Sequence, residues 1–264
     1  MPTVHEISRF LEQLAPLELA EEWDNVGLLL GDAERDVSSV MTCLTVTPDT
    51  VSEAIAAGVG LLVSHHPMPF RPLARLTTHT SAGNLLWQLA SHGVSVYSLH
   101  TAWDSAECGV NSMLADKLGL ENVSPLVPSE ISTAGRIGTG RIGRLLRPTT
   151  LTEVEELLHR QLPHCRLRWV GQRSAVTTVA IACGSGGSLL PHAIRQKCDL
   201  FLTGEATFHN CLEAEAAGMA MVMTGHFASE RFSVETLAEL LAKEFAGLKV
   251  WASTVELDPV RSQA

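Results

Sequence analysis

Short apolar runs of strand length alternate with helical patterns along most of the chain. The strand-like runs are residues 40–46, 59–64, 94–99, 179–183, 200–203, 219–224 and 248–253. The helical patterns lie at residues 3–14, 47–58, 81–91, 111–118, 188–197 and 229–245, and another begins at Thr150. Because parallel strands need a crossover between them, usually a helix, this alternation predicts an α/β fold with largely parallel sheets.

Several of these helices carry specific signals at their ends. Thr3 with Glu6, and Thr150 with Glu153, have the spacing of a capping box, in which each residue satisfies a backbone N–H of the first helical turn. Pro48 suits the first position of a helix, where its missing N–H costs nothing. These signals place helix starts independently of the apolar periodicity.

Composition limits the classes of function. The 264 residues allow one large α/β domain or two small ones, and 45% hydrophobic with 18% charged residues is typical of a globular protein with a substantial core. The net charge of −10 makes nucleic acid an unlikely partner. No apolar run approaches the roughly 20 residues of a membrane span, and no signal-peptide pattern opens the chain, so we expect a cytoplasmic protein without a membrane partner.

The most specific chemical signal is His65-His66-Pro67, which follows the apolar run 59–64. Adjacent residues on a strand point to opposite faces, so a single metal ion rarely takes both histidines from a straight strand. Two histidines that emerge from a strand end into a loop can instead serve two neighbouring metal ions.

The second signal is a similarity between the two halves of the chain. Residues 84–93 lead through an apolar run to His100-Thr-Ala-Trp-Asp104, and residues 210–218 lead through another to His226-Phe-Ala-Ser-Glu230. Each half therefore contains a helix, a glycine, a strand and a His-x-x-x-carboxylate. Convergence on common α/β patterns is the alternative explanation, but two matching sets of metal-ligand type are harder to obtain in that way.

Six imidazole and carboxylate groups follow strand ends, where open α/β sheets bind their ligands. They are His65, His66, His100, Asp104, His226 and Glu230. Without a thiolate, this set suits zinc, iron or manganese better than copper(I) or an iron–sulfur cluster. Six groups exceed the needs of one tetrahedral ion, so we expect two divalent ions with a bridging carboxylate. For His100 taken alone, a hydrogen-bonded structural role is about as common as metal ligation.

Four weaker motifs leave alternatives open. Gly184-Ser-Gly-Gly187 can hold a phosphate on its backbone N–H groups or form only a tight connection. In residues 135–144, which alternate glycine and arginine, a twisted strand with solvent-facing arginines is favoured over a phosphate-contacting loop. Asp24-Asn25 either orients a site loop or forms a turn, and Glu205 and His209 are candidates for proton transfer or for orienting the ligands.

A set of segments in order along nearly the whole chain resembles one known family. They are residues 22–31 (Glu22-Trp-Asp-Asn-Val-Gly-Leu-Leu-Leu-Gly31), 64–67, 100–104, 109–111, 118–120, 140–143, 183–187, 203–205 with His209, and 225–226 with 229–230. The chain resembles the Nif-three-like proteins, also described as GTP cyclohydrolase 1 type 2 homologues.

The resemblance implies a dinuclear metal centre, and its ligands here correspond to His65, His66, Asp104, His226 and Glu230, with His100 close to the site. It also implies two interlocked, related α/β domains and a toroidal homohexamer. We expect the first domain at residues 1–125, the second at 126–227, and residues 228–264 packed with the first. The stretch 122–132, which is rich in proline, serine and threonine, marks the boundary.

The function that these features favour is a metal-dependent hydrolase acting on an unknown small molecule. A water shared by two metal ions attacks the substrate, and Glu205 or His209 moves protons. One alternative is a non-catalytic metal-binding ring that stores, delivers or senses metal; another is an interaction scaffold, for which DNA is disfavoured by the charge. No feature of the sequence selects guanine, so GTP cyclohydrolase activity is implied by the family label alone.

Overall fold

The chain folds into two compact units. The computed structural model describes residues 1–130, 135–163 and 165–261. The first unit is Met1–Trp103 with Arg231–Ala264, and the second is Asp104–Glu230. The chain therefore leaves the first unit within α4 (His100–Ser105) and returns to it within α9 (His226–Glu244).

The two compact units begin and end at other residues than the expected domains, whose boundary at residue 125 stays a prediction. Residues 104–125 lie in the second unit, where α5 (Val110–Lys117) packs against β8 (Arg141–Thr149) and β10 (Val176–Ala182). Residues 131 and 132, at the end of the expected boundary stretch, lie outside the described residues.

The first unit is built on a sheet whose strands follow the order β1-β4-β3-β2-β13. The strands are β1 (Gly27–Leu30), β4 (Ser95–Ser98), β3 (Leu61–Ser64), β2 (Ser39–Cys43) and β13 (Lys249–Ala252). β4, β3, β2 and β13 are mutually parallel, as the helical crossovers of the sequence predict, and β1 joins the edge antiparallel. The C-terminal strand β13 thus completes the sheet that the N-terminal residues begin.

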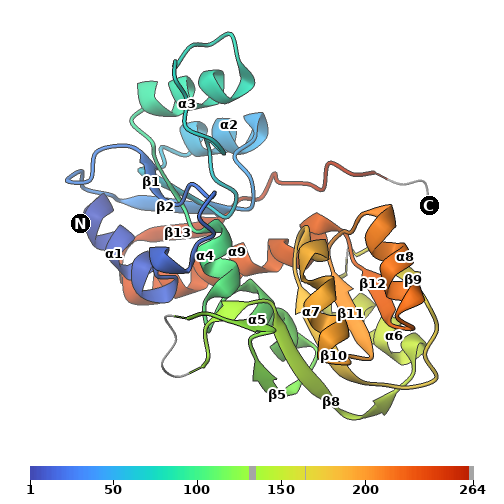
Figure 1. The fold of residues 1–264 in the computed structure, drawn as a ribbon. Coiled ribbons are helices and arrows are strands. Elements are labelled where there is room, and N and C mark those ends of the chain that lie inside the picture. Colours follow the sequence, from blue (N-terminus) through green and yellow to red (C-terminus); the bar gives the residue numbers. More distant parts are fainter. Residues whose placement is uncertain (131–134, 164, 262–264) are drawn as a thin grey trace. The chain divides into compact units, whose positions relative to one another are not determined.

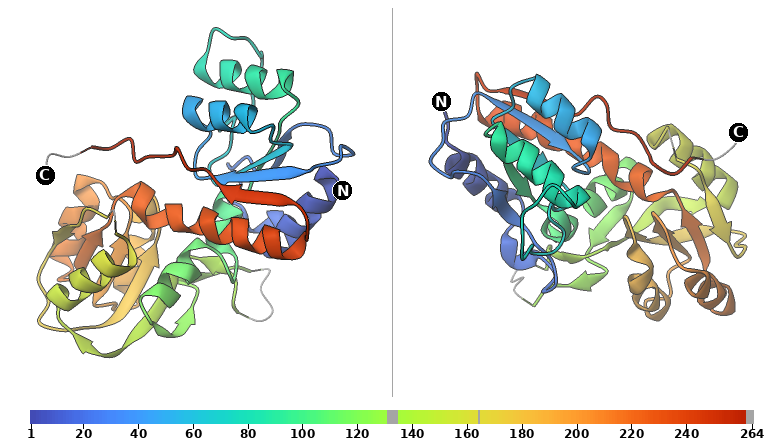
Figure 2. Two further views of the ribbon diagram at one scale, coloured as in Figure 1. Left: turned by 180° about the vertical axis from the view of Figure 1, so that it is seen from behind. Right: turned by 90° about the horizontal axis from the view of Figure 1, so that it is seen from above.

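Helices cover both faces of this sheet. Figures 1 and 2 show α2 (Pro48–Ala56) and α3 (Ser81–Ser91) side by side on one face, with α1 (Val4–Leu14) and α9 toward the other. Successive side chains of β2 point to opposite faces of the sheet, which explains this arrangement. Met41 and Cys43 pack in a core cluster with residues of α2 and α3. Thr42, between them, donates a hydrogen bond to the Val234 carbonyl of α9 at 2.6 Å. Both faces of the central strands are buried, which is why they read as continuous apolar runs.

The second unit has a sheet in the order β5-β8-β10-β11-β12-β9. Its remaining strands are β5 (Glu121–Ser124), β11 (Leu200–Thr203), β12 (Ala220–Met223) and β9 (Arg168–Val170), and β6 (Val127–Pro128) pairs separately with β7 (Gly138–Thr139). β10, β11 and β12 are parallel, but β5, β8 and β9 pair antiparallel. The expectation of a largely parallel sheet is therefore wrong for this unit, because an apolar run identifies a strand but not its direction.

Two short helical crossovers make β10, β11 and β12 parallel to one another. η2 (Gly186–Leu189) and α7 (Leu190–Arg195) connect β10 to β11, and α8 (Phe208–Ala216) connects β11 to β12. α7 and α8 lie on one face, over a core that includes Ala193, Phe201 and Met221, and α6 (Leu151–Gln161) lies on the other (Figures 1 and 2).

Arg141 corrects the expectation that the arginines of residues 135–144 face solvent. Arg144 is exposed, but Arg141 is only 2% exposed. Its guanidinium donates hydrogen bonds to the carbonyls of Gly138 and Ala106 and to Ser112 Oγ. Burial lowers the pKa of Arg141 to about 10, so it stays charged at neutral pH. A guanidinium can be buried where its donors find acceptors, and backbone carbonyl acceptors leave no trace in the sequence.

The internal similarity seen in the sequence reappears as a matching order of elements. In the first half, α3 ends before Gly93, β4 follows, and α4 begins at His100; in the second, α8 ends before Gly218, β12 follows, and α9 begins at His226. Both glycines have positive φ, +68° and +63°, a conformation that residues with a Cβ avoid. In each half, therefore, a histidine is the first residue of a helix that follows a parallel strand.

Of the helices in the described ranges, none combines the length and apolarity needed to cross a bilayer.

Candidate functional site

Three histidines meet at the carboxyl ends of β3 and β4 in the first unit. His65 and His66 follow β3, and their N–H groups continue its pairing by donating to the carbonyls of Cys43 and Leu44 at 3.0 and 2.8 Å. His100 follows β4, and its N–H donates to the His65 carbonyl at 3.0 Å. One ring nitrogen from each of His65, His66 and His100 lies within 4.8 Å of the others, which is a geometry that can hold a metal ion.

Asp24 fixes the orientation of His100. Its Oδ1 lies 2.7 Å from His100 Nδ1, and its Oδ2 accepts hydrogen bonds from the backbone N–H of Thr101 at 3.1 Å and from the Thr101 hydroxyl. Burial would raise the pKa of Asp24, but the hydrogen bonds from His100 and Thr101 and the charge of His100 outweigh it and lower the pKa to about 2. Asp24 is therefore ionised and holds a proton on Nδ1, so that Nε2 is the nitrogen of His100 that can bind a metal. The orienting role was one of two alternatives for Asp24-Asn25.

The backbone of His100 is strained. Its φ is +31°, in a region that residues with a Cβ rarely adopt. Such strain persists only where the surroundings enforce it, and it concentrates at functional sites. Here the enforcing contacts are the bonds of its N–H to His65 and of its ring to Asp24.

Thr45 orients His66 in a way that the sequence did not reveal. Thr45 Oγ1 lies 2.8 Å from His66 Nδ1. The loop that carries Thr45 is held from the C-terminal segment, since Glu256 accepts the N–H groups of Leu44 and Thr45 at 2.9 and 2.6 Å and pairs with Arg231 at 3.2 Å. The apolar run predicts a strand over residues 40–46, which includes Thr45, whereas β2 ends at Cys43; nothing in the sequence points to Glu256.

A second cluster lies at the carboxyl ends of β10, β11 and β12 in the second unit. His226 Nε2 lies 3.1 Å from Glu230 Oε2, one helical turn further along α9. His226 Nδ1 lies 3.0 Å from Glu205 Oε1, and Glu205 also accepts a hydrogen bond from Ser185 Oγ. Burial would lower the pKa of His226, but its hydrogen bonds with Glu230 and Glu205 and their charges raise the pKa to about 9. The two carboxylates therefore stabilise positive charge at this imidazole.

Asp104 belongs to the same unit as Glu230. Burial raises the pKa of the Cys183 thiol well above its usual value, and the negative charges of Glu230 and Asp104 raise it further. The Asp104 carbonyl accepts from Asn111 Nδ2 at 3.0 Å, and Asn111 Oδ1 accepts from the Cys183 N–H at 2.8 Å. A short hydrogen-bonded path through Asn111 thus connects the segments that carry Asp104 and Cys183.

His209, the other candidate for proton transfer, lies exposed on α8. The centroid of its ring lies 6.1 Å from that of the neighbouring Phe208.

The glycines of Gly184-Ser-Gly-Gly187 are explained by close packing. A Cβ on Gly184 would collide with Glu230 Oε1 and lie 3.3 Å from His226 Nε2, and the φ of Gly184 is +61°. A Cβ on Gly186 would collide with Ala182, and one on Gly187 would lie 2.6 Å from Asn210 Oδ1. These contacts favour the tight connection over a phosphate-binding loop.

Both clusters fit divalent metal ions by their donor chemistry. The first offers three imidazoles, two of which are oriented by side-chain partners at the second ring nitrogen, an arrangement that is usual for metal-ligating histidines. The second offers an imidazole with carboxylates at both ring nitrogens, and the absence of a Cβ at Gly184 leaves space beside Glu230. We call these groups the first half-site (His65, His66, His100) and the second half-site (His226, Glu230).

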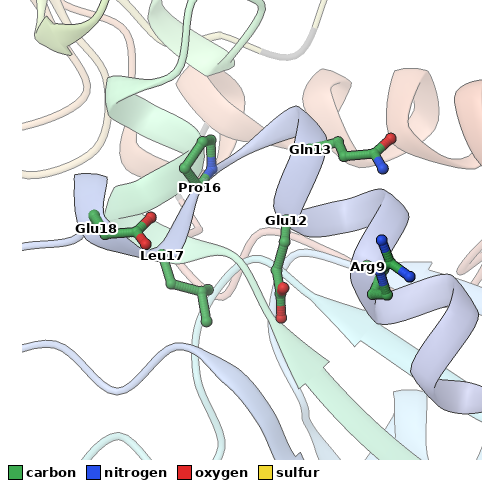
Figure 3. A pocket seen from close by; sticks show the side chains of 6 residues that line it. All are labelled: Arg9, Glu12, Gln13, Pro16, Leu17 and Glu18. Carbon is green, nitrogen blue, oxygen red and sulfur yellow. The ribbon is translucent and has the colours of Figure 1, made fainter.

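A surface hollow elsewhere in the first unit has a different character. It has a volume of about 320 Å³ and is lined by residues of α1 and of the turn that follows it, η1 (Leu17–Leu19). Figure 3 shows its side chains: Arg9, Glu12, Gln13, Pro16, Leu17 and Glu18. No member of the half-sites, all of which lie within the described ranges, lines this hollow, so it contributes nothing to the metal chemistry.

Known proteins are similar to this chain in sequence and in fold. A family model described as Duf34/NIF3 (NGG1p interacting factor 3) matches residues 2–259. A GTP cyclohydrolase 1 type 2 homolog of Streptomyces coelicolor is 34% identical over 98% of this chain and 94% of its own. A protein NIF3 homolog of Schizosaccharomyces pombe is 34% identical over 96% of each chain. The crystal structure of a Staphylococcus aureus hypothetical protein superposes with a TM-score of 0.88 and 26% identity over 99% of each chain. The chain therefore belongs to the Duf34/NIF3 family.

Proposed function

We propose that the chain is a metal-dependent hydrolase that binds two divalent ions per subunit, zinc, iron or manganese, and uses them as one dinuclear centre. The ligands are His65, His66, Asp104, His226 and Glu230, with His100 as a further ligand. The observation that carries the proposal is a donor cluster at the carboxyl ends of adjacent parallel strands in each unit. The first unit offers three imidazoles there, and the second offers the imidazole of His226 with the carboxylate of Glu230.

Other features support metal binding over a structural role for these histidines. Metal-ligating histidines usually donate their other ring N–H to a carboxylate, a carbonyl or water, and His100 and His226 each have a carboxylate at Nδ1. The positive φ of His100 adds a strained residue at the same place.

The chain's own residues suit hydrolysis. Two bound divalent ions would lower the pKa of a shared water and stabilise the negative charge of the transition state. Hydrogen bonds from Ser185 and His226 lower the pKa of Glu205, so its carboxylate is ionised at neutral pH. Glu205 thereby orients His226 and can accept a proton released during the reaction. His209, exposed on α8, can carry that proton to solvent.

The substrate is a small molecule whose bond to carbon or phosphorus is cleaved by water. Several relatives bear the name GTP cyclohydrolase 1 type 2 homolog, which supports a hydrolytic reaction on a polar ring or ester.

We further propose that the protein acts in the cytoplasm as a homohexameric ring, as the sequence resemblance implies. Light scattering would then give six times the mass of the chain.

The experiment is an assay of the metal-loaded protein on a panel of nucleotides, cyclic amides and phosphoesters. His65→Ala removes a buried ligand, and His5→Ala removes an exposed histidine of α1 as the matched control. Turnover of at least one compound by the wild type and by His5→Ala, but not by His65→Ala, supports the proposal. If the wild type shows no turnover above His65→Ala, the chain is not a hydrolase of these compounds. Rapid metal exchange would then favour the non-catalytic metal-binding ring.

A further inference from the structure

Two large aromatic side chains lie exposed in the first unit beside its histidines. Trp23 is 59% exposed and Phe70 is 49% exposed. Their ring centroids lie 5.8 Å apart with the planes tilted by 40°. Removing such rings from water is strongly favourable in free energy. Two neighbouring exposed rings therefore indicate a surface that binds another molecule.

The aromatic pair borders directly on the first half-site. The Trp23 and Phe70 centroids lie 5.9 and 6.1 Å from that of His100, at interplanar angles of 79° and 74°. The His100 ring in turn lies 5.4 Å from His65 and 5.5 Å from His66. An aromatic surface and a cluster of metal-type donors are therefore contiguous within one unit.

Hydrogen bonds fix the chain segments that carry the two rings. Asn25 Nδ2 donates to the Pro69 carbonyl at 2.7 Å, which joins the segment after Trp23 to the segment before Phe70. The Glu21 N–H donates to Thr101 Oγ1 at 3.0 Å, on the other side of Trp23. Because these segments are already fixed without a ligand, binding costs little ordering of the backbone.

We propose that Trp23 and Phe70 bind a planar heteroaromatic ring of the substrate. The site combines aromatic faces, which stack on flat rings of many kinds, with polar donors at one edge. A ring that carries polar atoms satisfies both, because it stacks on Trp23 and Phe70 while its polar substituent reaches the histidines. That the bound ring belongs to a substrate rests on the proposed function. Binding of the ring can be measured whether or not the protein turns it over.

The test measures binding by calorimetry with the full-length, metal-loaded protein. Adenosine monophosphate and nicotinamide mononucleotide are the ring-bearing probes, and ribose 5-phosphate is the same sugar phosphate without a ring. We expect at least one ring-bearing probe to bind about tenfold more tightly than ribose 5-phosphate, as stacking on aromatic side chains implies.

Substitutions identify the rings responsible. Trp23→Ala and Phe70→Ala should each weaken binding of the ring-bearing probe by about fivefold or more and leave ribose 5-phosphate unaffected, and Trp23→Phe should restore most of the affinity. Trp87→Ala is the matched control, because Trp87 lies in the same unit and is 52% exposed. Trp87→Ala should leave the affinity for both kinds of probe unchanged.

Two outcomes would overturn the inference. The first is ring-bearing probes that bind no more tightly than ribose 5-phosphate, or whose binding is unaffected by Trp23→Ala and Phe70→Ala. The second is a change in oligomeric state of these variants in sedimentation without loss of ring binding, which would make the pair a contact between copies of the chain. Absence of turnover in a protein that binds rings through Trp23 would count against the hydrolase proposal alone.

Discussion

Asp24 Oδ1 lies 2.7 Å from His100 Nδ1, and the Asp24 side chain is fully buried behind that imidazole. The pair resembles the carboxylate–histidine arrangement of metal sites, in which the carboxylate fixes the tautomer and strengthens the histidine as a ligand.

Asp24→Asn tests this relationship. Asparagine keeps the shape and an acceptor oxygen but removes the charge, so we expect the first half-site to bind zinc about 10- to 100-fold more weakly. Competition with a chromogenic chelator measures the change. Asp116→Asn, at an exposed position of α5, is the control and should bind like the wild type. Equal affinities for Asp24→Asn and the wild type would contradict the role of the Asp24 charge in metal binding through His100.

Thr45→Val tests the orientation of His66. The substitution preserves volume and removes the hydroxyl that lies 2.8 Å from His66 Nδ1, so zinc affinity should fall about tenfold. Thr45→Ser keeps the hydroxyl and should restore the affinity. If Thr45→Val and Thr45→Ser bind zinc equally well, the hydrogen bond has no role in positioning the ring.

Gly184→Ala tests the second half-site with an unusually close control. An alanine Cβ at Gly184 would collide with Glu230 Oε1, whereas at Gly119, whose φ is +65° against +61° for Gly184, a Cβ would meet nothing within 4 Å. Both variants should lose about 1 kcal/mol of folding free energy to the left-handed backbone. Only Gly184→Ala should also lose metal, by about one ion per subunit, in mass-spectrometric analysis of metal content. Equal metal content in both variants would remove Gly184 from the site.

Glu153→Gln tests a pH dependence far from the half-sites. Hydrogen bonds from the Thr150 N–H, Arg147 and the Thr150 hydroxyl lower the pKa of Glu153 to about 2. Because the folded pKa lies below the ordinary value of 4.5, the ionised carboxylate stabilises the fold above about pH 4.5, and this contribution disappears as the pH falls toward 2. Urea midpoints of the wild type and of Glu153→Gln should differ at pH 7, differ less at pH 3, and converge as the pH falls to about 2. Glu156→Gln, on the same helix, is the control; a difference that persists unchanged at pH 3 would contradict the assignment.

The sequence was a good guide to elements whose signals are local. The Thr3–Glu6 and Thr150–Glu153 capping boxes form as expected, and α2 begins at Pro48. β11 occupies residues 200–203, as the apolar run indicates, because a short run flanked by polar residues leaves little choice of boundary. The family itself was also recognisable, since its motifs are contiguous segments.

Features that depend on distant contacts were not predictable. The antiparallel strands of the second sheet have no directional signal, and Arg141 is buried because carbonyls far along the chain accept its hydrogen bonds. The contribution of Glu256 to the Thr45 loop spans more than two hundred residues. The candidate histidines were found because strand ends and residue types are local, whereas their orienting partners are tertiary.

Metal content tests the central claim most directly. The wild-type protein and His5→Ala, purified without added metal and then loaded with zinc, should contain about two ions per subunit by mass spectrometry, as two half-sites of these donors imply. His65→Ala and His226→Ala should each retain about one ion or fewer. A content unchanged in both variants, or below about 0.2 ions per subunit in the loaded wild type, would contradict the account.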